Sequence, residues 1–165
     1  MENRLNMEWL KGFDPVIDKN SKVLILGSFP SVKSREQGFY YGNKQNRMWK
    51  VLENATKKTV PNDALQRREF LLENNIAMWD VVKECKIIGS SDSDIKEENS
   101  VAVDFDKVLN EYDNIKLIIC NGKKAHEIFI RFNPDKSAIC LPSTSSANGR
   151  FNMKVWVDAL EKVLK

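Results

Sequence analysis

Residues 22–27, Lys-Val-Leu-Ile-Leu-Gly, form a short apolar run that ends in a glycine. Three similar runs follow, at residues 76–82, 116–120 and 138–141. Continuous apolar runs of this length, rather than an alternation of apolar and polar residues, are typical of strands that are covered on both faces. The sequence therefore predicts a four-stranded parallel sheet with helices on each side.

Five segments with helical spacing of apolar residues lie between and after these strands. They cover residues 46–54, 62–75, 105–112, 123–132 and 151–165, with Asn62 and Asp104 as N-caps. Their apolar stripes, including Leu65 and Val155, are expected to face the core. Strands that alternate with helices imply right-handed crossovers, and the predicted fold is an α/β, three-layer α/β/α sandwich.

The length and composition indicate a single globular domain, residues 1–165. A chain of 165 residues fits one domain, since domains run to about 100–200 residues. No apolar run approaches the roughly 20 residues of a membrane helix, and residues 1–11 mix charged with single apolar residues, unlike a signal peptide. We expect a cytoplasmic monomer. The net charge of +3 permits a polyanionic partner without requiring one.

The sequence contains few cysteine and histidine residues, the side chains that most often bind transition metals. The chain has three cysteines, Cys85, Cys120 and Cys140, with no Cys-x-x-Cys pair, and a single histidine, His126. We therefore expect no metal and no cofactor. Cys120 and Cys140 end apolar runs and are expected to be buried in strands. The polar, acidic segment 89–99 is expected to be an exposed excursion.

Ligands of parallel sheets bind beyond the carboxyl ends of the strands, so the loops that begin at Gly27, Asp80, Asn121 and Pro142 are the candidates for a site. Residues 27–31, Gly-Ser-Phe-Pro-Ser, form the first of them. Backbone N–H groups and a hydroxyl in such a turn suit a phosphate. The alternative is a purely structural turn, because Gly and Pro mark turns in general.

Two further loops are unusual. Residues 38–42, Gly-Phe-Tyr-Tyr-Gly, lead to Asn-Arg-Met-Trp at 46–49. An exposed ring there could stack on a planar base, although aromatic residues usually pack in the core. Residues 141–150, Leu-Pro-Ser-Thr-Ser-Ser-Ala-Asn-Gly-Arg, offer small hydroxyl side chains that suit phosphates. A flexible serine-rich loop is the alternative.

In order and spacing these loops resemble the motifs of the uracil-DNA glycosylase superfamily, in its hypoxanthine-excising branch. Residues 27–31 resemble the first motif, and residues 38–42 with 46–49 resemble the matching run of mismatch-specific and hypoxanthine-specific enzymes. Residues 141–148 resemble the second motif in its Pro-Ser-Thr-Ser form, and Asn121 stands where the family has a polar residue after the third strand. The resemblance covers nearly the whole chain.

The resemblance implies strand order 2-1-3-4 and a base that is flipped out of the DNA stack. It implies that Tyr41 stacks on this base and that Asn121 reads its edge, because an amide offers both donor and acceptor. The implied base-binding residues are Phe29, Phe39, Tyr41 and Asn121. The implied DNA-binding residues are Ser28, Ser31, Ser143, Thr144, Ser145, Ser146, Asn148 and Arg150. The partner is DNA that contains deaminated bases.

The chain departs from many members of the superfamily at two positions. Phe29 stands where many hold an Asp or Asn that positions water, and Leu141 stands where uracil-excising enzymes hold a His. Both absences match the hypoxanthine branch, and the catalytic residue implied instead is Asn46. Its amide would orient water or hydrogen-bond the departing purine; a helix N-cap is the alternative, and both roles can coexist. An amide supplies no full charge, so we expect modest rates.

The substrate expected from the resemblance is hypoxanthine, with uracil as the chief competitor and xanthine as a third candidate. Ser145 stands where relatives insert a bulky side chain into the gap left by the base, which predicts a preference for single strands or mismatches. The alternatives are a uracil- or mismatch-specific glycosylase and a non-catalytic nucleic-acid-binding member. Another kind of nucleotide-binding α/β protein is disfavoured, because no Gly-x-Gly-x-x-Gly or P-loop lysine follows the first run.

Overall fold

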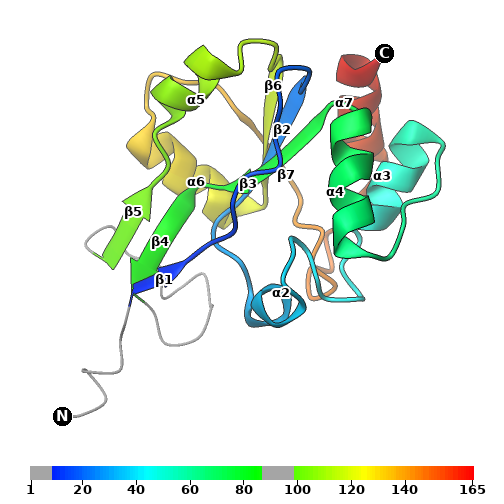
Figure 1. Ribbon diagram of the computed structural model, residues 1–165, viewed down its shortest axis with the longest axis horizontal. Helices are drawn as coiled ribbons and strands as arrows, with labels where there is room; N and C mark the ends of the chain where they lie inside the picture. Colours follow the sequence, from blue (N-terminus) through cyan, green and yellow to red (C-terminus); the bar gives the residue numbers. More distant parts are fainter. Residues whose placement is uncertain (1–8, 87–98) are drawn as a thin grey trace.

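A four-stranded parallel sheet forms the centre of the molecule (Figure 1). The computed structural model describes residues 9–86 and 99–165. The strands lie in the order β3-β2-β6-β7, and each neighbouring pair is parallel. Their bounds are β2 Val23–Gly27, β3 Ile76–Asp80, β6 Leu117–Asn121 and β7 Ile139–Leu141. In order of occurrence along the chain this is 2-1-3-4, so the predicted fold class and strand order are confirmed.

Helices cover both faces of this sheet. Successive side chains of a strand point to opposite faces, so each strand contributes to two cores. Leu24 and Leu26 pack in one core, which includes side chains of α5 (Phe105–Glu111) and α6 (Lys123–Phe132). Val23 and Ile25 pack in the other core, with three further helices. These are α3 Met48–Thr56, α4 Ala64–Glu73 and α7 Met153–Leu164. Figure 1 shows the resulting three layers.

All five predicted helices are present, and three details of them were wrong. Asp63, not Asn62, caps α4 by accepting a hydrogen bond from the backbone N–H of Gln66 at 3.1 Å. Leu65 is 66% exposed because α4 contacts the core only through its carboxyl-terminal half, at Phe70 and Leu71. Val155 of α7 is also exposed, because the buried face of that helix runs through Trp156 and Leu160.

Short elements beside the central sheet were not predicted. A small antiparallel sheet has the order β1-β4-β5, with bounds β1 Trp9–Lys11, β4 Val82–Lys86 and β5 Ser100–Ala102. A short helix, α2 (Val32–Gln37), follows β2. The predicted strand 76–82 is therefore two strands that meet at Val81, where the chain leaves the parallel sheet. The predicted excursion 89–99 lies, except for Asn99, outside the described residues.

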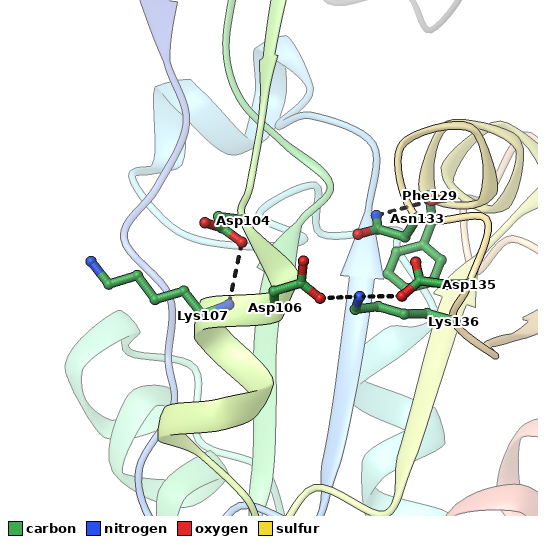
Figure 2. A network of polar contacts seen from close by, with 7 residues as sticks. All are labelled: Asp104, Asp106, Lys107, Phe129, Asn133, Asp135 and Lys136. Carbon is green, nitrogen blue, oxygen red and sulfur yellow. Dashed lines mark hydrogen bonds and ion pairs between the residues drawn. The ribbon is translucent and has the colours of Figure 1, made fainter.

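A network of polar contacts connects the loop before β7 to α5 (Figure 2). Asp104 caps α5, as predicted, by accepting the backbone N–H of Lys107 at 3.2 Å. Lys136, in the loop before β7, pairs with Asp106 of α5 and with its neighbour Asp135. These contacts lie at the amino end of β7 and leave its carboxyl end free to carry the loop that follows.

The three cysteines differ in accessibility. Cys85 and Cys120 are buried, and burial raises their pKa values to about 11 and about 12. Cys140 is exposed, so the prediction that it is buried was wrong: β7 is a three-residue edge strand with exposed positions. In residues 9–86 and 99–165, no helix has the length and apolar character of a membrane span.

We expect one thiol of the native protein to react with an aromatic disulfide reagent at pH 8, and all three thiols to react in denaturant. The thiolate is the reactive form, and burial keeps Cys85 and Cys120 both protonated and inaccessible. Mass mapping should locate the native label at Cys140, and Cys140→Ser should remove it. Equal labelling rates at all three cysteines would contradict the burial described here.

Candidate active site

A cavity of ≈ 200 Å³ lies at the carboxyl ends of the parallel strands. It is formed by the ends of β2, β3 and β6 together with the loops that follow β2 and β7; in Figure 1 the loop after β7, drawn in orange, lies near α2. The residues that line it are Phe13, Gly27, Ser28, Phe29, Pro30, Ser31, Ser34, Tyr40, Tyr41, Asn43, Asn46, Asp80, Asn121, Ser143, Thr144 and Ser145. Tyr41, Asn46 and Asn121 thus share one cavity, as the sequence predicts.

Two glycines shape this cavity. A Cβ atom on Gly27 would lie 2.6 Å from Oδ1 of Asp80, so only glycine leaves room for that carboxylate at the end of β2. Gly122, which follows β6, has φ +95°, a backbone conformation that favours glycine. A Cβ there would also lie 3.3 Å from Cβ of Ser143. Gly122 therefore allows the loop after β7 to pack against the end of β6.

Serine side chains connect the first motif to the aromatic loop. Ser31 caps α2 by accepting the backbone N–H of Ser34 at 3.1 Å. The buried hydroxyl of Ser34 in turn accepts the backbone N–H of Gly42, also at 3.1 Å. The turn after β2 and the loop that carries Tyr41 are therefore fixed relative to each other.

The two tyrosines of the aromatic loop have different surroundings. Tyr40 is buried, and its hydroxyl donates to the backbone carbonyl of Asp14 at 2.7 Å. Tyr41 adopts φ 49°, and its carbonyl accepts the indole N–H of Trp49 at 3.0 Å. The Tyr41 hydroxyl is buried and has no hydrogen-bond partner among the described residues.

The surroundings of Tyr41 keep its hydroxyl protonated. Burial raises the pKa of Tyr41 most, and the nearby carboxylate of Asp80 raises this pKa further. The amide of Asn121 lies near enough to act in the opposite direction, although no hydrogen bond forms between the two groups. The hydroxyl is therefore a neutral donor that lies near both Asp80 and Asn121.

Thr144 is the polar centre of the site. Its hydroxyl accepts from Nδ2 of Asn121 at 2.9 Å and donates to Oδ1 of Asn46 at 2.8 Å. Its backbone N–H donates to Oδ1 of Asn121 at 3.0 Å. Oδ1 of Asn46 also accepts the backbone N–H of Met48 at 2.9 Å. These bonds fix the orientation of both amides.

Arg47 holds the loop after β7 in place. Its backbone N–H donates to the carbonyl of Thr144 at 3.0 Å, and Nη1 donates to the carbonyl of Asn148 at 3.0 Å. Its guanidinium lies over the ring of Phe151, 4.8 Å from the ring centre. Asn148 braces the same loop by donating from Nδ2 to the carbonyl of Ser143 at 2.9 Å. The serine-rich loop is therefore ordered by specific hydrogen bonds.

Most of the predicted site residues line the cavity, and four do not. Phe39 lies stacked on Trp49, 6.2 Å between ring centres, and lines a different cavity, so the structure does not bring this predicted base-binding residue together with Tyr41 and Asn121. Ser146, Asn148 and Arg150 lie outside the cavity, in the outer part of the loop. Thr144 lines the cavity, but it is fully buried and connects the two amides; its predicted contact with DNA stays a prediction.

Asp80 is the main cavity residue to which the sequence assigned no role. It ends β3 and is 4% exposed. Its position at a strand end was the available signal. His126, on α6, does not line the cavity. Among the described residues, no group of three or more His, Cys, Asp or Glu side chains is placed to hold a metal ion.

Comparisons with known proteins agree with this architecture. The family model of the uracil DNA glycosylase superfamily matches residues 15–163. A protein of Methanosarcina acetivorans named hypoxanthine DNA glycosylase is 36% identical over 145 residues, which cover 86% of this chain and 90% of that protein. A protein of Methanosarcina barkeri with the same name is 37% identical over 143 residues, 85% and 89% of the two chains.

A solved structure shows the same fold. The solution NMR structure of a candidate uracil DNA glycosylase from Methanosarcina acetivorans superposes with a TM-score of 0.79 at 31% identity, and the match covers 94% of this chain and 99% of that one. The parallel sheet and its strand-end cavity thus define an α/β protein of the glycosylase type. The chain belongs to the uracil DNA glycosylase superfamily. Within that superfamily, the two Methanosarcina relatives are named for hypoxanthine.

Proposed function

We propose that this chain is a DNA glycosylase that hydrolyses the N-glycosidic bond of deoxyinosine and releases hypoxanthine. The observation that carries the proposal is that Tyr41, Asn46 and Asn121 line one cavity at the carboxyl ends of the sheet. An aromatic ring for stacking and two oriented amides suit a flipped, planar, uncharged base. The relatives named for hypoxanthine support this base over uracil.

Asn46 acts as a hydrogen-bond donor to the departing purine in this proposal. Its Oδ1 already accepts two hydrogen bonds, from Met48 and Thr144, and a carbonyl oxygen has two lone pairs. Its Nδ2 has no hydrogen-bond partner among the described residues. Glycosidic cleavage passes through an oxocarbenium-like state, in which negative charge builds up on the leaving base. The N–H groups of Asn46 stabilise that charge, whereas its oxygen is not free to orient water.

Asn121 recognises the base through the part of its amide that does not bond to Thr144. Oδ1 and Nδ2 of Asn121 each make one hydrogen bond to Thr144, which leaves one N–H and one lone pair. The remaining N–H donates to the carbonyl of the base. Tyr41 stacks on the ring, and Phe29 contributes an apolar wall. Exposed Ser31, Ser146 and Arg150 are placed at the surface, where they contact phosphates.

The test is incubation of the protein with oligonucleotides that carry one deoxyinosine, deoxyuridine or deoxyxanthosine. We expect alkali-labile abasic sites at deoxyinosine, and none in undamaged DNA. Binding without any abasic site would support the alternative of a non-catalytic member. Faster release of uracil than of hypoxanthine would support the uracil-specific alternative.

The loop after β7 also predicts the DNA structure that is preferred. Residues 143–149 carry no bulky side chain to fill the gap left by an extruded base. Extrusion from a stable pair costs a few kcal/mol, so we expect single-turnover release about tenfold faster from single strands or mismatches than from a duplex with cytosine opposite. Ser145→Leu should raise the duplex rate. Equal rates on all substrates would contradict this prediction.

A further inference from the structure

A second cavity, of ≈ 680 Å³, lies beside the active-site cavity. Its walls come from the carboxyl end of α2, the aromatic loop, the start of α3 and the amino end of α4. We call it the side cavity, and Phe39, Trp49 and Arg67 are among the residues that line it. Asn43 lines both this cavity and the active-site cavity. The two cavities therefore adjoin at the aromatic loop.

Aromatic side chains form one wall of the side cavity. The rings of Phe39 and Trp49 lie nearly parallel, at 21° to each other, and the guanidinium of Arg67 lies 4.3 Å from the centre of a Trp49 ring. Trp49 is only 8% exposed, whereas Phe39 is partly buried. Phe39 is therefore the ring of this layer that a planar ligand can reach and stack on.

The same cavity carries an excess of positive charge. Lys44 is exposed, and Arg67 donates from Nε to the carbonyl of Pro61 at 2.7 Å but forms no ion pair with a carboxylate in residues 9–86 and 99–165. The one carboxylate in the wall, Asp63, already caps α4. The terminal N–H groups of an arginine suit a phosphate, which they can contact in pairs. The cavity thus favours an anionic ligand.

An unpaired nucleotide has both of the features that these walls select. Proteins that bind single strands combine cationic side chains, which follow the phosphates, with aromatic rings on which bases stack. In a duplex the bases stack on one another and offer no free face to Phe39. A peptide would need an acidic and an aromatic residue together, whereas each nucleotide of a single strand supplies a phosphate and a planar base.

We propose that the side cavity binds an unpaired nucleotide of the strand whose damaged base occupies the active-site cavity. The base of this nucleotide stacks on Phe39, and its phosphate lies near Lys44 and Arg67. The inference rests on the proposed function and adds a second nucleotide site to it. The site contributes affinity for single strands, separately from the lower cost of extruding an unpaired base.

The first experiment scans a single strand with abasic spacers. Oligonucleotides of about 15 nucleotides carry a central 2′-fluoroarabino hypoxanthine nucleotide, which resists cleavage, and one spacer at successive flanking positions. Fluorescence anisotropy gives the Kd of each. In the wild-type chain we expect a spacer at one or two adjacent positions to raise Kd about tenfold, as for the loss of one stacked base. Phe39→Leu keeps an apolar side chain but lacks the ring, so the spacer should have little effect there.

The second experiment uses a pair of charge variants outside the core. Ala64 lines the side cavity at the first position of α4, whereas its neighbour Leu65 is 66% exposed and does not line it. Because an acidic residue is favourable in the first turn of a helix, both Ala64→Glu and Leu65→Glu should fold. At low salt we expect Ala64→Glu to bind the unmodified single strand about fivefold more weakly than the control Leu65→Glu, because it repels the phosphate.

The outcomes separate this site from the proposed function. A wild-type chain without any spacer effect, or a spacer effect of the same size in Phe39→Leu, would overturn the inference. Equal single-strand affinities of Ala64→Glu and Leu65→Glu would also overturn it, and are expected if the cavity binds a protein instead. Failure of the wild-type chain to release hypoxanthine from a cleavable strand would instead refute the proposed function.

Discussion

Replacing Asn46 by Asp is expected to slow the release of hypoxanthine by about 10²–10³-fold, the usual effect of removing one donor from a developing negative charge, with little change in stability. Asp retains the oxygen that accepts the hydrogen bonds of Met48 and Thr144, and an acidic side chain is favourable at the start of a helix. It lacks only the N–H groups. Single-turnover rates on deoxyinosine and thermal unfolding measure the two effects separately.

Asn46→Ala removes the donor together with the oxygen that accepts hydrogen bonds from Met48 and Thr144. We expect a similar loss of rate and, in addition, a loss of about 1 kcal/mol of stability, as is typical for a lost hydrogen bond. Asn43→Ala is the matched control, since Asn43 also lines the cavity and its Oδ1 accepts the backbone N–H of Gln45; its rate should stay within a few-fold of wild type. A fast Asn46→Asp enzyme would show that the oxygen, by orienting water, is the important atom. A fast Asn46→Ala enzyme would refute the assignment.

The central sheet was predictable because its strands are short and apolar throughout. Strands β2 and β6 are covered on both faces, so their residues form continuous apolar runs. The same continuous apolar pattern made the end of β3 unpredictable from the sequence. Val81 and Val82 are as buried as the strand before them, and an apolar run does not indicate where the chain leaves one sheet and enters another.

The site was predictable where position along a strand determines location. Tyr41, Asn46 and Asn121 come together because the carboxyl ends of parallel strands and the loops that follow them lie at one edge. The role of Thr144 was not predictable, because its two amide partners are 23 and 98 positions away in the chain. A threonine among serines resembles a surface residue until the loop is folded over the end of β6.

The placement of Asp80 in the cavity could not be predicted from the sequence for a related reason. The last residue of an apolar strand can turn toward solvent, toward a helix or over the neighbouring strand. Its direction here depends on Gly27, a residue of another strand, and on the absence of a Cβ there. A pattern within one segment carries no information on such a pairwise fit.

Thr144→Val is expected to lower the rate of hypoxanthine release by about 10–100-fold and to cost about 1–3 kcal/mol of stability, the usual penalty when buried polar groups lose a partner. Valine has nearly the same shape and removes only the hydroxyl that connects Asn121 to Asn46. The backbone bonds of residue 144, to Asn121 and from Arg47, remain in the variant. Both amides should then lose their fixed orientation. Thr144→Ser retains the hydroxyl and should keep most of the activity.

A double-mutant cycle distinguishes positioning from a general effect on folding. If Thr144 acts on the reaction by aligning the donor of Asn46, then Thr144→Val should slow Asn46→Ala much less than it slows the wild type, because residues in one hydrogen-bonded network are not additive. Single-turnover rates of the four proteins, measured well below their unfolding temperatures, give this coupling. Additive effects, or a normal rate in Thr144→Val together with reduced stability, would mean that the hydroxyl supports the loop and does not align the catalytic amide.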